Sequence, residues 1–161
     1  MNPIHIRTVV RRGIVSEWQP VLDRGDGVWL GVVENGLAVG SREVISKRIA
    51  GSNYVPLWPL LEGDFDETLE LLAGSWNKLS SGGVETPERL MQLVVGSAVA
   101  GGSRYWIELS MRWLERMVNG ERFDQSFVEH SLEKVKQTAQ GTQSLKHQAL
   151  RALGNLRRQS R

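Results

Sequence analysis

The chain has 161 residues, a formal net charge of +2 and no cysteine. A chain of this length can bury enough surface to fold without a disulfide or a metal. The absence of cysteine excludes thiolate catalysis, cysteine-ligated zinc and disulfide frameworks, and is typical of proteins in a reducing compartment. No apolar stretch approaches the ~20 residues that a membrane-spanning helix requires. We therefore expect a single cytoplasmic domain, residues 1–161.

The N-terminal residues have the period-two pattern of strands. Ile4 and Ile6 alternate with polar neighbours, which predicts a half-buried strand. The apolar run from Val28 to Glu34 predicts a covered strand, and Asn35-Gly36 is the preferred pair for a type I′ turn. A hairpin is therefore predicted over residues 28–39.

The register of this hairpin follows from the expected two-residue turn. Glu34 then faces Leu37, and Gly31 faces Gly40, which leaves a spot on the sheet without side chains. A ligand could approach the backbone there. Alternatively, the glycines mark a bend or a hollow filled by a ring such as Trp29 or Trp58, which is the more common use of strand glycines. Residues 43–49 are compatible with either a third strand or a short helix.

The hydrophobic period changes after the segment from Tyr54 to Leu61. Pro56 and Pro59 argue against a regular helix there. This segment divides a β-containing part, residues 1–60, from a helical part, residues 61–161. Helix starts are predicted where a short polar residue can cap the first turn, at Asp64 or Asp66, Thr86, Asp124, and Thr142 or Ser144. Helix ends are predicted at glycine-containing positions, namely Gly101-Gly102, Asn119-Gly120 and Gly141.

The most informative helix is predicted over residues 104–118. It is apolar over most of its circumference, which is expected of a helix surrounded by other elements. One stripe contains Trp106, Leu109, Trp113 and Met117, and the adjacent stripe contains Ile107, Met111, Leu114 and Val118. We predict that this is the central helix and that Trp106, Leu109 and Trp113 are buried.

No combination of residues predicts catalysis, a cofactor or a metal site. The sequence Asp64-Phe65-Asp66-Glu67 could hold a divalent cation, but acids at a helix start are stabilised by the helix dipole without a metal. His5, His130 and His147 lack a ligating spacing. Gly96 and Ala100 form a small-residue face that would let another helix approach.

The charges are segregated along the chain, which suggests two binding surfaces. Residues 54–77 contain five acids and no base, and this acidic segment could steer a basic protein partner, such as a toxin domain. A solvated helix face with capping acids explains it equally well. The candidate partner-binding residues are Glu62, Asp64, Asp66, Glu67 and Glu70.

The opposite charge is concentrated at the other end of the chain. Residues 134–161 contain seven basic residues and no acid, and could contact the phosphates of a nucleic acid. Basic residues on the outer face of a last helix are also ordinary. The candidate nucleic-acid contacts are Lys146, Arg151, Arg157 and Arg158.

Two segments of the helical part resemble a known group of proteins. Residues 104–109 (RYWIEL), followed by residues 112–115 (RWLE) and later by residues 143–149 (QSLKHQA), are similar to helices of small uncharacterised bacterial proteins of immunity or accessory type. The resemblance covers about the last sixty residues and implies no catalytic residue. It implies a helical C-terminal half and a role in binding a protein partner.

These observations predict an α+β fold, in which a small antiparallel sheet precedes a bundle of four to five helices. The first functional hypothesis is a non-enzymatic protein-binding protein of the immunity type, which would mask a toxin. A nucleic-acid-binding accessory protein is the second hypothesis. An enzyme without a recognisable motif is the third.

Overall fold

The computed structural model describes residues 9–11, 14–138 and 140–160. The expected strand around Ile4 and Ile6 lies outside these residues. A two-stranded sheet pairs β1 with β2, and a four-stranded antiparallel sheet has the order β3-β4-β5-β6. The strands of the described residues are β1 (Val9–Arg11), β2 (Ile14–Ser16), β3 (Gln19–Asp23), β4 (Trp29–Val33), β5 (Gly36–Gly40) and β6 (Ile45–Arg48).

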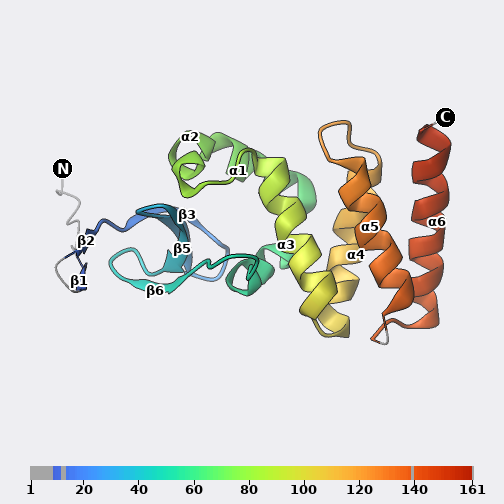
Figure 1. Ribbon diagram of the computed structural model, residues 1–161, viewed down its shortest axis with the longest axis horizontal. Coiled ribbons are helices and arrows are strands. Elements are labelled where there is room, and N and C mark those ends of the chain that lie inside the picture. The colour runs from blue at the N-terminus through green and yellow to red at the C-terminus, as the bar shows by residue number, and fades with distance from the viewer. Residues whose placement is uncertain (1–8, 12–13, 139, 161) are drawn as a thin grey trace.

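Helices follow the sheet, so the predicted α+β fold is confirmed. Figure 1 shows the sheet at one end of the long axis and α6 at the other end, with α3, α4 and α5 between them. Every helix of the described residues is too short or too polar to cross a membrane. The helices are η1 (Val55–Glu62), α1 (Phe65–Gly74), α2 (Trp76–Leu79), η2 (Ser80–Gly82), α3 (Pro87–Gly101), α4 (Arg104–Val118), α5 (Gln125–Gln137) and α6 (Gln143–Gln159), where η denotes a 3₁₀ helix.

The predicted hairpin exists, but its predicted register is wrong. Val33 pairs with Gly36, and Gly31 pairs with Ala38 rather than with Gly40. The two turn residues are therefore Glu34 and Asn35, one position earlier than expected. Asn35 has a φ of 61°, and asparagine tolerates this left-handed conformation well. Each residue of β4 therefore pairs with a β5 residue two positions earlier in the chain than expected.

A tryptophan ring covers the backbone at Gly31, but it is neither Trp29 nor Trp58. The ring of Trp18 lies so close that a Cβ built on Gly31 would be 2.8 Å from it. The indole Nε1 of Trp18 also donates a hydrogen bond to the Ser41 carbonyl oxygen (3.0 Å). The hollow is therefore filled from within the chain, which agrees with the structural interpretation of the glycines rather than with a ligand site.

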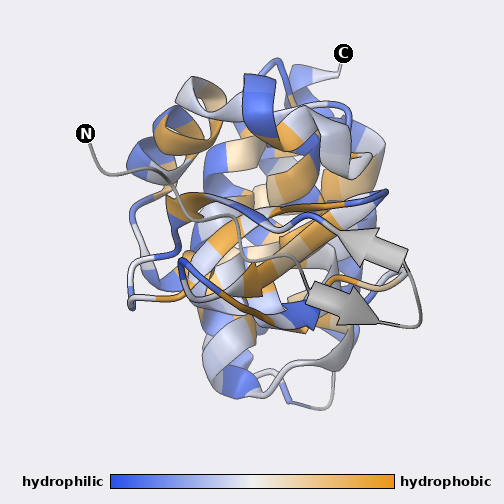
Figure 2. Cartoon of the chain, turned by 90° about the vertical axis from the view of Figure 1, so that its left-hand side faces the viewer, coloured by the Kyte–Doolittle hydropathy of each residue, from blue (hydrophilic) through white to orange (hydrophobic). Residues whose placement is uncertain are grey.

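The strand at 45–48 resolves the ambiguity of residues 43–49 in favour of a strand. Strand β3, which contains Pro20, was not predicted. Proline lacks an N–H group and is tolerated at a sheet edge, and β3 is an edge strand. Figure 2 views the molecule from the sheet end and is coloured by hydropathy; the most hydrophobic strands are β4 (WLGVV) and β5 (GLAVG), whereas β6 (ISKR) is mainly hydrophilic.

One hydrophobic core extends from the inner face of the sheet through the helical part. It includes Leu30 and Leu37 from the sheet, Leu90 from α3 and Leu153 from α6. Helix α4 contacts α3, α5, α6 and η1, as expected of a central helix. Its predicted bounds, Arg104–Val118, are those observed.

The two apolar stripes of α4 are buried to different extents. Trp113 is 3% exposed, but Trp106 and Leu109 are only partly buried, so the prediction for these two residues is wrong. Trp106 packs against the rings of Trp58 in η1 and of its neighbour Tyr105, with ring centres 5.8 and 5.0 Å apart. All four members of the adjacent stripe are buried, namely Ile107, Met111, Leu114 and Val118.

Candidate functional site

The acidic segment is largely occupied by contacts within the chain. The Asp64 carboxylate caps α1 by accepting a hydrogen bond from the Glu67 backbone N–H (3.0 Å). Glu62 accepts a hydrogen bond from the Tyr105 hydroxyl (2.8 Å). Both Asp66 carboxylate oxygens accept hydrogen bonds from Arg116, at 2.8 and 2.6 Å. Three of the five predicted partner-binding acids therefore have partners on this chain.

Helix α4 brings positive charge to a segment that has none in sequence. Arg116 also lies 5.8 Å from the centre of the Phe65 ring, and Arg112 lines the same surface cleft of about 470 Å³. The pKa of Arg116 is raised by Asp66, and the pKa of Tyr105 is raised by its hydrogen bond to Glu62. The exposed acids that remain available for a partner on α1 are Glu67 and Glu70, which lie near the exposed Leu71.

The basic last helix is also partly neutralised within the fold. Arg157 contacts Glu129 at 3.4 Å and Glu133 at 3.0 Å, both on α5. Arg158 donates a hydrogen bond to the Asn155 side chain (2.6 Å). Arg151 is exposed and Lys146 is partly buried. The four predicted nucleic-acid contacts therefore do not form an uncompensated basic stripe.

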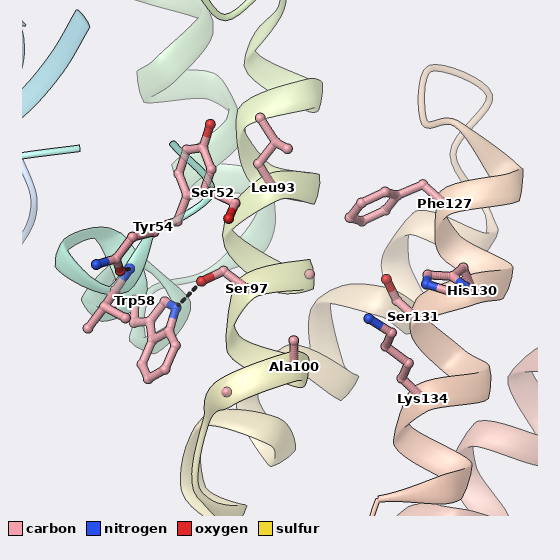
Figure 3. Close-up of a pocket in the computed structure, with 14 residues that line it drawn as sticks. Ser52, Tyr54, Trp58, Leu93, Ser97, Ala100, Phe127, His130, Ser131 and Lys134 are labelled. Carbon is pink, nitrogen blue, oxygen red and sulfur yellow. Dashed lines mark hydrogen bonds between the residues drawn. The ribbon is translucent and has the colours of Figure 1, made fainter. Parts of the chain in front are cut away.

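A groove of about 540 Å³ lies between η1, α3 and α5, and it is lined by none of the predicted partner-binding acids or nucleic-acid contacts. Its floor is one face of α3, and Figure 3 shows the side chains of η1 on one side and those of α5 on the other. The floor residues are small apart from the first one: Leu93, Gly96, Ser97, Ala100 and Gly101.

The wall formed by η1 is held in place by several contacts. The Trp58 indole Nε1 donates a hydrogen bond to the Ser97 hydroxyl (3.2 Å; Figure 3). Its ring packs on Trp106, with the ring centres 5.8 Å apart. Arg24 also donates a hydrogen bond to the Pro56 carbonyl oxygen, which joins η1 to the end of β3. Trp58 therefore has one defined position before any partner arrives.

The opposite wall depends on close packing between α5 and α3. A Cβ built on Gly96 would lie only 2.6 Å from Cζ of Phe127, so the ring sits directly on the backbone of α3. Arg89 covers the Phe127 ring at 5.4 Å from its centre. Further along α3, Ala100 is exposed, so no helix of the described chain covers this end of the small-residue face.

The ionisable side chains that line the groove are Tyr54, His130 and Lys134. Burial raises the pKa of Tyr54, and the nearby Arg89 partly opposes this change. His130 and Lys134 are exposed, and among the described residues neither forms an ion pair or a hydrogen bond. Within the same part of the chain, no Asp or Glu lines the groove.

The sequence provided only fragments of this groove. The small-residue face at Gly96 and Ala100 was recognised in the sequence. The three contributing segments, 52–58, 93–101 and 127–134, are far apart in sequence. The apolar segment containing Tyr54 and Trp58, which joins the two parts of the chain, was the available signal for the remaining wall.

No group of three or more His, Asp or Glu that could hold a metal ion occurs in the described residues. The Asp64–Glu67 cluster instead caps α1 and binds Arg116. Comparisons of the chain with models of protein families, with curated proteins and with solved structures find no match.

Proposed function

We propose that this chain is a non-enzymatic protein-binding protein whose partner docks in the groove over α3. The observation that carries this proposal is the groove's lining. Tyr54, Trp58 and Phe127 stand partly exposed around a floor of small residues. Aromatic residues are enriched in protein interfaces, where a few of them supply most of the binding energy.

The contacts around the walls add to this support. Trp58 is fixed by Ser97 and Trp106, and Phe127 is fixed between Gly96 and Arg89. Side chains that are already ordered lose little conformational entropy when a partner binds. The open edges at Ala100 and Lys134 suit a macromolecule better than an enclosed small molecule.

The proposal has a more specific form. The resemblance of the C-terminal helices favours an immunity-type protein of the cytoplasm that masks a toxin. A basic toxin domain would then be attracted by the two available acids of α1, Glu67 and Glu70, while its anchoring contacts lie in the groove. Attraction between opposite charges speeds association more than it adds affinity.

Site-specific crosslinking tests the proposed function. A photoreactive amino acid replaces Ala100 in the groove, and in a matched protein it replaces Ala73, which is exposed on α1. We expect one protein to be captured in the source cells from position 100 but not from position 73. Binding of that purified protein should then be lost in Ala100→Arg and kept in Ala73→Arg. Equal binding by both arginine variants would refute the groove as the docking site.

Nucleic-acid binding stays the alternative. It predicts a complex that weakens steeply with salt and with the loss of Lys146 and Arg151. An electrophoretic shift assay at low salt with micromolar protein tests it, and Arg157→Gln is the internal control. Because Arg157 already contacts two α5 carboxylates, its neutralisation should matter less than that of Arg151.

A further inference from the structure

The floor of the groove follows one face of α3 over about two helical turns. Leu93, Ser97 and Ala100 are separated by four and three residues and therefore lie above one another on the helix surface. At 1.5 Å per residue, the distance from Leu93 to Gly101 is roughly 12 Å. Small side chains along such a face allow a second backbone to approach closely, because the separation of two packed helices depends on the side chains between them.

We propose that the groove binds an amphipathic α-helix of the partner protein that carries carboxylates along the edge facing α5. The inference rests on the proposed function, because it names the part of the partner that would occupy the same groove. It has two elements, the helical form of the occupant and the sign of its charge, and each follows from a separate observation.

The helical form follows from what borders the groove. Extended peptides usually bind by adding a strand to a sheet edge, where unpaired backbone groups are available. This groove is bordered by α3, α5 and η1 and by the short loop before η1 (Figure 3). The backbone groups of the helices are largely bonded within those helices, and the Asn53 N–H in the loop donates a hydrogen bond to the Ala50 carbonyl oxygen. An extended peptide would lose its backbone hydrogen bonds to water here, whereas a helix satisfies its own. Apolar side chains spaced three and four residues apart would meet the aromatic walls.

The sign of the charge follows from the cations around the groove. Lys134 stands on the α5 edge, and Arg89 lies at the other end over Phe127. The nearest acids along α5 are Glu129 and Glu133, and both contact Arg157 of α6. Lys134 has no anionic partner within the described residues, so a carboxylate on the occupant would be its first.

Selection from two displayed libraries tests both elements. One library presents a stable helix with one face randomised, and the other presents extended, proline-containing peptides of similar length. Each is selected on the full chain and counter-selected on Ala100→Arg, so that only binders dependent on the groove are kept. We expect binders from the helical library, with apolar residues at i, i+3, i+4 and i+7 and with Asp or Glu on one flank.

Charge is then tested with a purified binder and two lysine variants. Lys134→Glu should weaken the binder's affinity about three- to tenfold, since an exposed ion pair becomes a repulsion. Lys78→Glu is the matched control, because Lys78 is exposed on α2 outside the groove, and it should leave the affinity unchanged. Replacing the binder's acids by lysine should weaken its binding to the native chain. The same replacement should restore binding to the Lys134→Glu variant.

Several results would overturn the inference. Binders that come only from the extended library would refute the helix, and indifference to Lys134→Glu would refute the charge. A helical library without any groove-dependent binder would refute both. These outcomes differ from failure of the proposed function, in which the natural partner binds Ala100→Arg as well as it binds the native chain. A natural partner that uses the groove through an extended or basic segment would leave the function intact and remove this inference alone.

Discussion

Replacing Gly96 by alanine sets two known effects against each other at the wall of the groove. Alanine in a helix interior is favoured over glycine by roughly 0.8–1.0 kcal/mol. The added methyl group, however, would lie 2.6 Å from Cζ and 3.4 Å from Cε2 of Phe127. Such a separation is far below ordinary van der Waals contact, so the ring or the two helices have to move.

The steric effect should be the larger one. Overpacking of a well-packed site costs about 1–3 kcal/mol, and a shift of the Phe127 ring would disturb its contact with Arg89. We therefore expect Gly96→Ala to lower the free energy of unfolding by up to about 2 kcal/mol. Gly154→Ala supplies the matched control in α6, where the nearest atom to the new methyl group is 4.0 Å away. That variant should gain about 0.5–1 kcal/mol.

Urea denaturation followed by circular dichroism measures the free energy of unfolding of both variants. The slope of this free energy against urea concentration should be the same for the variants and the native chain. A double-mutant cycle with Phe127→Leu then isolates the contact, because the smaller side chain should make Gly96→Ala less costly. If Gly96→Ala stabilised the chain as much as Gly154→Ala does, Phe127 would not lie on Gly96 and the described wall would be wrong.

Three further predictions use the same measurements or a purified partner. Trp113→Ala should cost about 3–5 kcal/mol, as large aromatic truncations in cores do, and a change below about 1 kcal/mol would remove Trp113 from the core. The pKa of Glu133 is lowered by Lys136 and then by Arg157, so its contribution to stability should be present above the ordinary glutamate pKa and lost as the pH falls below it. Urea midpoints of the native chain and Glu133→Gln should accordingly converge at acid pH, and a constant difference would contradict this. Glu67→Gln combined with Glu70→Gln should slow association with a basic partner and reduce its salt dependence in stopped-flow experiments, and an unchanged rate would make these acids ordinary surface residues.

The helical part could be predicted from local sequence because its boundaries have local causes. The side chains of Asp64, Thr86, Asp124 and Thr142 each accept a hydrogen bond from a first-turn backbone N–H group. The same residue types signal helix starts in any sequence. The spacing of the apolar residues predicted the bounds and the central position of α4. It could not predict which of the two stripes is more deeply buried, because that depends on how η1 packs against the helix.

The β part and the groove depend on contacts that local patterns do not contain. The hairpin register depends on which two residues form the turn, and β3 is defined by its pairing with β4. The groove combines a pre-helical loop and η1 with parts of α3 and α5 that lie about forty and seventy residues further on. Likewise, the partner of Asp66 is Arg116, fifty residues away. Such pairings become visible only when the core brings the segments together.

The hairpin register has a consequence for how the chain folds. A two-residue change of pairing partner leaves every side chain on its original side of the sheet, because the strand repeat is two residues. Leu30, Val32, Leu37 and Val39 would therefore point toward the helices in both alignments. Burial of these side chains therefore does not by itself discriminate between the two registers. The turn has to discriminate between them: a type I′ turn at Asn35-Gly36 requires a positive φ at both residues, whereas here Asn35 has a positive φ and Gly36 does not.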